Sequence, residues 1–275
     1  MPTLISSPVS PRPFLKWAGG KGQLIQQYLP YFPRNFRTYY EPFLGGGAIF
    51  FHLLPPQAML TDINPELVNV YRCIRDRVDA VIALLEQHQQ QHCRDYYYQM
   101  RSTVSEDAVE RAARLIYLNR TCYNGLYREN AKGQFNVPMG RYKAPKVCNL
   151  DLLRSVSQAL QSTEIALESF DAVLTRARTS QDFVYFDPPY HPISATSRFT
   201  AYSRYSFHPA DQIHLHDTFV ELANRGVKVM LSNSDCPFVR DLYQNFTIHT
   251  ITASRAINSN AQRRGKITEV LVTSY

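Results

Sequence analysis

The sequence has few of the features of secreted, membrane-anchored or metal-stapled proteins. It contains five cysteines among 275 residues, an odd number with wide spacing and no CxxC pair, which argues against a disulfide framework and a zinc ribbon. It contains no run of about 18 apolar residues and no N-terminal secretory pattern. We therefore expect free thiols in a reducing cytoplasm, no membrane span, and a flexible leader over residues 1–11.

Charge and composition point to a folded protein with an anionic partner. Lysine and arginine total 30 against 23 acidic residues, a net charge of +7, and nucleic acid is the leading candidate partner for such a surplus. Taken alone this signal is weak, because many solvated surfaces carry a similar excess. With 44% hydrophobic and 19% charged residues, the chain can form one large domain, or one domain with an insertion. The eight histidines are scattered, and no metal site is predicted.

Apolar segments that end at polar residues alternate with helical patterns. The predicted strands are 36–43, 58–62, 182–190 and 227–235, and the predicted helices are 48–54, 64–88 and 211–226. This alternation predicts an α/β fold with a doubly wound, largely parallel sheet. The segment 247–275 alternates apolar and polar residues on both sides of a basic centre, which predicts an antiparallel hairpin at the sheet edge.

Residues 66–161 do not follow this rhythm. They are mostly helical in pattern, rich in arginine and tyrosine, and contain a loop-like stretch at about 119–145. We interpret them as an inserted domain, so that the α/β domain is discontinuous and consists of residues 12–65 and 162–275.

Two strand ends carry features of a nucleoside-binding site. The stretch EPFLGGGAIF (41–50) runs from a strand through three glycines into a helix, where the backbone can approach a ligand closely. Asp62 lies 17 residues after Gly45, near the spacing at which an acid binds ribose hydroxyls. The alternatives are a tight turn for the glycines and an N-cap for Asp62, before a helix starting near Pro65. The pair together favours the ribose role.

The stretch LKWAGGKGQ (15–23) invites comparison with a phosphate-binding P-loop. Gly22 follows Lys21 where a serine or threonine should bind magnesium, and no buried strand precedes the glycines. We therefore exclude an NTPase, and keep Trp17 and Lys21 as candidate lining of a cofactor pocket.

The ordered set of motifs resembles a known family. KWAGGK (16–21), EPFLGGG (41–47), the inserted domain and FVYFDPPY (183–190) follow one another as in the alpha class (D12) of Dam-type DNA adenine-N6 methyltransferases. The similarity covers about residues 14–275. It implies a Rossmann-like methyltransferase sheet with a mainly helical DNA-recognition domain at 66–161. It also implies a bacterial, cytoplasmic enzyme that uses S-adenosyl-L-methionine on double-stranded DNA.

In the family that this chain resembles, a flipped adenine is held at the DPPY motif. The amine of adenine is a poor nucleophile, and needs acceptors for its two N–H bonds as charge develops on nitrogen. Asp187 and the carbonyl of Pro188 are the implied acceptors, Pro188 and Pro189 preset the backbone without offering a donor, and Tyr190 stacks on the base. The alternative is an ordinary strand-ending turn.

The resemblance also assigns cofactor contacts. Lys21 is implied beside the methionyl carboxylate, Asp62 at the ribose, and Ile63 and Phe170 at the adenine ring. The full implied set is Trp17, Lys21, Glu41, Pro42, Phe43, Gly45, Gly47, Asp62, Ile63, Phe170 and Asp187.

NRTCYNGLYR and GQFNVPMGRY resemble the recognition hairpin of family members that methylate adenine in GATC. By this resemblance Arg128 contacts guanine, Tyr123 wedges into the base stack, and Asn124, Leu126 and Pro138 contact neighbouring bases. The alternative is that Tyr123 and Leu126 pack in the core of the inserted domain and that Arg128 is a solvated charge. The expected phosphate contacts are Lys16, Arg120, Arg141, Lys143, Arg263, Arg264 and Lys266.

Several alternatives stay open from the sequence. They are methylation of cytosine N4, of a protein amide or of RNA, and a DNA-binding relative without catalysis. The sequence also leaves open whether a restriction endonuclease acting on the same site is a partner. We expect a monomer, which can visit each strand of a palindromic site in turn.

Overall fold

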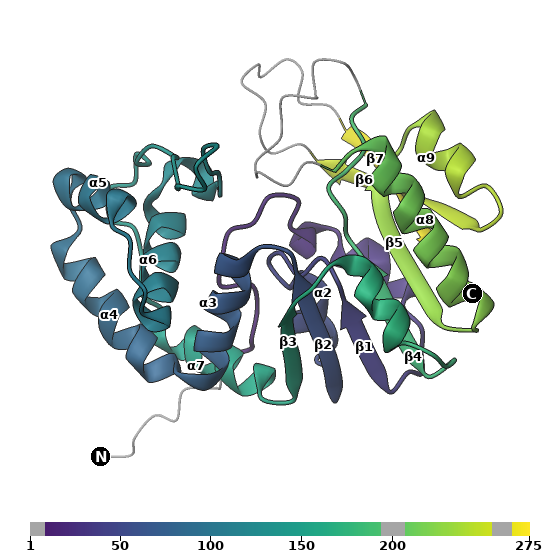
Figure 1. Ribbon diagram of the computed structural model, residues 1–275, viewed down its shortest axis with the longest axis horizontal. Coiled ribbons are helices and arrows are strands. Elements are labelled where there is room, and N and C mark those ends of the chain that lie inside the picture. The colour runs from purple at the N-terminus through teal and green to yellow at the C-terminus, as the bar shows by residue number, and fades with distance from the viewer. Residues whose placement is uncertain (1–8, 194–206, 255–265) are drawn as a thin grey trace. The chain divides into compact units, whose positions relative to one another are not determined.

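The computed structural model describes residues 9–193, 207–254 and 266–275, and its fold is α/β (Figure 1). Seven strands form one sheet in the order β3-β2-β1-β4-β5-β7-β6. Their bounds are β1 Thr38–Glu41, β2 Gln57–Asp62, β3 Thr163–Leu167, β4 Asp182–Phe186, β5 Lys228–Ser234, β6 Thr247–Ser254 and β7 Lys266–Thr273. The predicted doubly wound, largely parallel sheet is confirmed.

The strand pairing places the DPPY motif directly after a central strand of the sheet. β1 pairs in parallel with β2 and with β4, and β4 pairs in parallel with β5. All five residues of β4 are buried, as expected for a parallel strand covered on both faces. The DPPY motif therefore follows a strand that is buried and paired on both sides.

The C-terminal segment forms the predicted antiparallel hairpin. β7 pairs antiparallel with both β5 and β6, so β6 is the edge strand on that side. β3 was not among the predicted strands. Its sequence TEIAL is short and alternates buried with exposed positions, and it lies where we placed the border of the inserted domain.

Contacts along the chain define two compact units. Unit 1 comprises residues 1–20, 45–54 and 64–165, and unit 2 comprises residues 21–44, 55–63 and 166–275. These units differ from the predicted borders because residues 12–20 and 45–54 pack with the helical part of the chain. The functional division into 12–65, 66–161 and 162–275 stays a prediction.

Unit 2 has an apolar core of strands and helices. Helix α8 (Pro209–Asn224) buries Leu215, Phe219 and Leu222 in a cluster with Val184 of β4 and Val229 of β5. The smaller helical elements of this unit are η1 Lys21–Gln23, α1 Ile25–Tyr28, η2 Leu29–Tyr31, η4 Phe170–Thr175 and α9 Pro237–Leu242.

Unit 1 is mainly helical, as the sequence predicts for the inserted domain. Its helices are α2 Ala48–Leu53, α3 Pro65–Asp76, α4 Val78–Gln91, α5 Arg94–Ser102, α6 Ala108–Thr121 and α7 Leu150–Leu160, with the short turn η3 Tyr123–Gly125. The predicted helix 64–88 is in fact two helices, because Arg77 leaves the helical region with φ −138° and ψ 34°. No helix in the described part of the chain is long and apolar enough to cross a membrane.

Candidate active site and DNA-reading surface

Three predicted carboxylates lie at the carboxyl ends of neighbouring parallel strands. Glu41 ends β1, Asp62 ends β2, and Asp187 follows β4 directly. The strand order reverses between β1 and β4, and ligands of open α/β sheets bind at such a switch point. The structure thus brings the three predicted carboxylates to the carboxyl ends of neighbouring strands, and their roles stay predictions.

Asp187 is held by two donors. The ammonium of Lys21 lies 2.8 Å from Oδ1, and the hydroxyl of Ser232 donates to the same oxygen at 2.9 Å. Lys21 is only 3% exposed, and its ammonium also lies 4.8 Å from the centroid of the Tyr190 ring. Among the residues that the structure describes, the polar contacts to Asp187 thus end on Oδ1, so Oδ2 is the oxygen best placed to accept from a substrate.

Ser232 is a site residue that we did not predict. It is fully buried in β5, and its hydroxyl also lies 2.9 Å from the Tyr185 hydroxyl in β4. The only signal in the sequence is the polar run SNSD at the end of an otherwise apolar strand.

Tyr190 is held through its hydroxyl. It donates to Glu269 Oε2 of β7 at 2.7 Å. Removal of the hydroxyl from water, and then the charge of Asp187, raise the pKa of Tyr190 well above its ordinary value, so it remains a donor. Burial likewise raises the pKa of Glu269, against the opposing effects of Lys21 and of the bond from Tyr190. Glu269 was also absent from our predicted site.

The raised pKa of Glu269 gives a pH-dependent contribution to stability. Because the folded state binds this proton more tightly than the unfolded state, the contribution is fully present below the unfolded pKa, and is lost as pH rises through the folded pKa. We expect the stability of the wild type relative to Glu269→Gln to fall as pH rises from about 4 to about 7. Denaturant unfolding of both proteins over this range measures the difference. Glu86→Gln on the exposed face of α4 is the control, and a difference that does not change with pH would contradict the assignment.

The other predicted cofactor residues of unit 2 lie at or directly after the ends of β1 and β2, or in η4. Glu41 is 3% exposed and accepts from the Tyr39 hydroxyl at 2.9 Å, and Pro42 beside it is buried. Phe43 and Phe170 stack with ring centroids 5.5 Å apart. Ile63, the first residue after β2, is 42% exposed.

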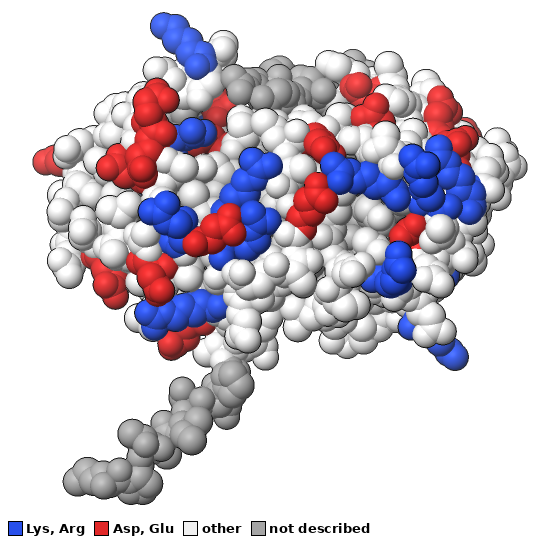
Figure 2. All heavy atoms as spheres, turned by 60° about the horizontal axis from the view of Figure 1, so that its bottom comes forward, with Lys and Arg blue, Asp and Glu red and all other residues white. Residues whose placement is uncertain are grey.

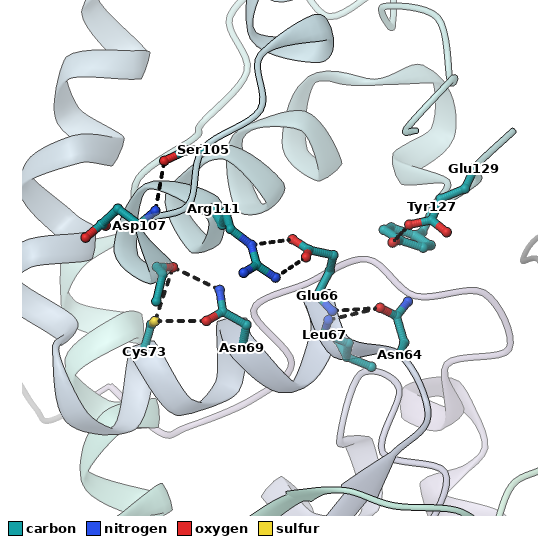
Figure 3. Close-up of polar contacts among 11 residues, drawn as sticks. Asn64, Glu66, Leu67, Asn69, Cys73, Ser105, Asp107, Arg111, Tyr127 and Glu129 are labelled. Carbon is teal, nitrogen blue, oxygen red and sulfur yellow. Dashed lines mark hydrogen bonds and ion pairs between the residues drawn. The ribbon is translucent and has the colours of Figure 1, made fainter. Parts of the chain in front are cut away.

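The alternative role of Asp62 as a helix cap is wrong. The N-cap of α3 is Asn64, whose side chain accepts from the backbone N–H groups of Glu66 and Leu67 (Figure 3). Asp62 is half-buried and is not used for this purpose. The ribose role of Asp62 stays a prediction, and the alternative role as a helix cap is excluded.

The glycine loop is shaped by aromatic residues of unit 1. Gly45 and Gly47 have φ of +48° and +63°, in the left-handed region that favours glycine. A Cβ on Gly45 would lie 3.0 Å from the Trp17 ring, and a Cβ on Gly47 would lie 3.0 Å from the Tyr71 hydroxyl. Tyr71 in turn donates to the Gly45 carbonyl at 3.2 Å. Both glycines are therefore required by conformation and by space.

We expect Gly47→Ala to destabilise the protein by more than the left-handed conformation alone would cost, which is about 1–2 kcal/mol. The excess comes from the close contacts of the added Cβ with the Tyr71 hydroxyl at 3.0 Å and with the Phe51 ring at 3.2 Å. Gly226→Ala is the matched control, because Gly226 has φ +78° and open space around it. Equal losses of unfolding free energy for the two variants would contradict the role of these contacts.

The predicted recognition hairpin presents the expected side chains to solvent. Tyr123 is 52% exposed, which contradicts the alternative that it packs in a core, whereas Leu126 is half-buried. Arg128 is exposed, and its Nε donates to Asn136 Oδ1 at 2.7 Å, which fixes the direction of the guanidinium. Asn124 and Pro138 are exposed on the same hairpin, and the Tyr123 N–H donates to the Pro138 carbonyl.

The base of the hairpin is tied to the N-terminal segment of unit 1. Trp17 stacks on Tyr127, with ring centroids 5.2 Å apart. Figure 3 shows the hydrogen bond that Tyr127 donates to Glu129. The backbone of Lys16 exchanges two hydrogen bonds with the Asn119 side chain on α6. Trp17 is therefore at least partly a packing residue, and its role at the cofactor stays a prediction.

The predicted phosphate contacts of unit 1 come together. Lys16, Arg120, Arg141 and Lys143 line one open depression of about 420 Å³, together with Tyr142, Ala144, Pro145 and Lys146. Burial, and then the like charge of Arg12, lower the pKa of Arg120, as expected where cations crowd. Such a group of cations suits a phosphate backbone.

Figure 2 shows one face of the molecule on which lysine and arginine groups alternate with aspartate and glutamate. The net charge of +7 therefore does not by itself locate a surface for DNA. The predicted contacts Arg263 and Arg264 lie outside the described residues, and of Lys266 only the backbone in β7 is described.

Comparison with known proteins decides the family. Residues 17–257 match the D12 class N6 adenine-specific DNA methyltransferases. The chain belongs to this family. It is 44% identical to the Type II methyltransferase M1.LlaDCHI of Lactococcus lactis subsp. cremoris, over 100% of this chain and 99% of that protein. It is 39% identical to the Type II methyltransferase M.MjaIII of Methanocaldococcus jannaschii, over 96% and 99% of the two chains. It is 37% identical to the DNA adenine methylase of Escherichia coli K12, over 94% of each chain.

Membership of the D12 class confirms the predicted family and its activity. The protein is an adenine-specific DNA methyltransferase, and DNA is its substrate. The alternatives of cytosine N4 and of a protein amide are removed with it.

Proposed function

We propose that the protein transfers the methyl group of S-adenosyl-L-methionine to N6 of an adenine flipped out of duplex DNA, within the sequence GATC. The proposal that Asp187 acts in methyl transfer rests on the orientation of its carboxylate. Lys21 and Ser232 both hold Oδ1, which directs Oδ2 to the substrate. The Tyr190 ring, fixed through Glu269, supplies the stacking surface.

Asp187 and Pro188 act as acceptors in this proposal. Asp187 Oδ2 accepts one N–H of the adenine amine and the Pro188 carbonyl accepts the other, so the nitrogen lone pair is freed from the ring as positive charge develops. N6 would form a bond to the methyl carbon as the bond from that carbon to the sulfonium sulfur breaks, with the bonding pair staying on sulfur as a neutral thioether, and the methylated nitrogen would then lose one proton to water. The protein's contribution is to position the amine in line with the bond that breaks.

The residues present fit S-adenosyl-L-methionine, which when bound supplies a methyl group on a sulfonium. Asp62 is not used as a cap, and would accept from the ribose hydroxyls. The exposed Ile63 and the stacked Phe170 would lie against the adenine ring. The implied contacts of Lys21 with the methionyl carboxylate, and of Trp17, Glu41, Pro42, Phe43, Gly45 and Gly47 with the methionine end, rest on the family resemblance.

The choice of GATC rests on the hairpin. Its two halves resemble those of GATC-methylating family members, and the side chains assigned to bases are exposed except for the half-buried Leu126. Arg128 reads guanine with a guanidinium whose direction Asn136 fixes. Arg120 and the other cations of the depression hold phosphates and carry no sequence information.

We expect Arg128→Ala to relax discrimination at one base, with a loss of about 1–3 kcal/mol against the correct site. The measurement is the methylation rate on GATC and on its single-base variants. Lys132→Ala is the control, because it removes an exposed positive charge from the same hairpin without an assigned base contact. Unchanged selectivity of Arg128→Ala across the panel would overturn the assignment.

We also propose that the protein acts as a monomer that methylates the two strands of the palindromic site in separate events.

Relatives named as Type II methyltransferases and relatives named as DNA adenine methylases both match this chain. Partnership with a restriction endonuclease on the same site and independent action both agree with this chemistry.

A further inference from the structure

The loop that carries Tyr190 is held at the two peptide groups on either side of this residue. The Pro189 carbonyl accepts from Gln212 Nε2 of α8 at 3.0 Å. The His191 N–H donates to Asn233 Oδ1 of β5 at 3.1 Å. The His191 carbonyl also accepts from the Ser234 hydroxyl at 2.7 Å. The backbone of the loop is thus fixed by side chains of other elements.

The two amides that hold the loop also hold each other. Asn233 Nδ2 donates to Gln212 Oε1 at 2.9 Å, and Asn233 Oδ1 accepts a second time, from the Ser234 N–H at 2.8 Å. Gln212 is 1% exposed and Asn233 is fully buried. Each amide can satisfy its partners in only one orientation, because a flip of either would place donor against donor or acceptor against acceptor.

The loop needs such support because of its own composition. Pro188 and Pro189 have no N–H, so neither can donate a backbone hydrogen bond that would anchor the loop to the sheet. Pro189 is also exposed. The carbonyl of Pro189 and the two backbone groups of His191 are therefore important points of attachment, and buried side chains meet all three.

We propose that Gln212 and Asn233 are positioning residues for methyl transfer, which set the plane of the Tyr190 ring and the direction of the preceding acceptors. This inference rests on the proposed role of Tyr190 as the stacking surface for the flipped adenine. Neither residue touches the reacting atoms. Their loss lets the loop shift, and a shift of about 1 Å at the reacting groups costs on the order of 100-fold in rate.

The first test uses Gln212→Met, which keeps the length of the side chain and removes both hydrogen bonds. We expect its single-turnover rate of methyl transfer to fall on the order of 10- to 100-fold at saturating DNA and cofactor. The affinity for S-adenosyl-L-methionine should stay within about twofold of the wild type, because the change acts on the chemical step.

A matched control separates positioning from stability. Thr218 lies on the same helix, is 2% exposed, and donates to the His214 carbonyl within α8. Thr218→Val therefore removes a buried hydrogen bond without touching the loop, and should leave the rate within about twofold of the wild type. Thermal unfolding of both variants confirms that each is folded at the assay temperature.

Gln212→Glu gives a signature that a purely structural role would not produce. The protonated carboxyl can donate to the Pro189 carbonyl and accept from Asn233, whereas the ionised carboxyl repels the carbonyl. We expect the rate of this variant, divided by that of Gln212→Met, to rise as pH falls. Two results together would overturn the proposal. The ratio of the Gln212→Glu rate to the Gln212→Met rate would not change with pH, and the Gln212→Met rate would lie within about twofold of the Thr218→Val rate.

The substrate is chosen so that the two proposals fail separately. All proteins are assayed on a duplex with one GATC site and on unmethylated genomic DNA of mixed sequence. Wild-type activity on the genomic DNA alone would discard GATC as the target, and the variants would then be compared on that DNA. A 2-aminopurine at the methylated position reports stacking, and should fluoresce more strongly in the complex with Gln212→Met than in that with the wild type.

Discussion

Asp187→Asn should lower the rate of methyl transfer by a factor on the order of 10²–10³, as is typical when one group of a preorganised polar site is lost. The substitution keeps the shape of the side chain but not its polarity. Lys21 and Ser232 both donate to Oδ1, so they should hold the amide oxygen of the variant. The amide NH₂ would then replace Oδ2 and present a donor to the donor N–H of adenine. The rate is measured in single turnover, which separates chemistry from product release.

The control for Asp187→Asn is Asp217→Asn, which removes an exposed carboxylate on α8 and should leave the rate unchanged. Binding of S-adenosyl-L-methionine is measured separately for both variants. A rate for Asp187→Asn close to that of the wild type would show that Oδ2 is not an acceptor for the amine.

Lys21→Met should destabilise the protein by about 3 kcal/mol and also reduce activity, because it leaves a carboxylate in a largely buried place without its cation. The side chains of Lys21 and Asp187 are 4% and 21% exposed, so we take the lower end of the range for a broken buried pair. Denaturant unfolding measures the change in the free energy of unfolding.

The double variant Lys21→Met with Asp187→Asn separates the pair from its surroundings. With neither charge present, the loss of stability should be smaller than the sum of the two single losses, by about 1–3 kcal/mol. Activity should not return, because the acceptor is absent. Strict additivity of the two losses would contradict a direct interaction between Lys21 and Asp187.

The sequence predicted the site best where a motif both ends a strand and carries the residues of the proposed chemistry. The apolar run into DPPY predicted the strand that ends as β4, with Asp187 directly after it. The three glycines predicted a tight turn, in which Gly45 and Gly47 adopt the left-handed φ that favours glycine. Family resemblance then supplied roles that composition does not encode, such as that of Arg128.

The supporting residues could not be predicted because they are distant in sequence and ordinary in type. Ser232, Asn233 and Glu269 reach the loop only because β5 pairs with β4 and with β7. Gln212 lies in a helix whose pattern gives no reason to single out one amide. β3 was missed because a short strand carries weak periodicity. The break at Arg77 was missed because it is a single residue between two helices, with no proline or glycine beside it to mark it.

The most direct test of the central claim is methyl transfer from tritiated S-adenosyl-L-methionine to a duplex with one GATC site, beside the same duplex with its adenine replaced. Wild type and Asp187→Asn are assayed together. We predict label only in the GATC duplex, on N6 of adenine, and its loss with Asp187→Asn. Equal label in both duplexes, or undiminished label with Asp187→Asn, would contradict the account.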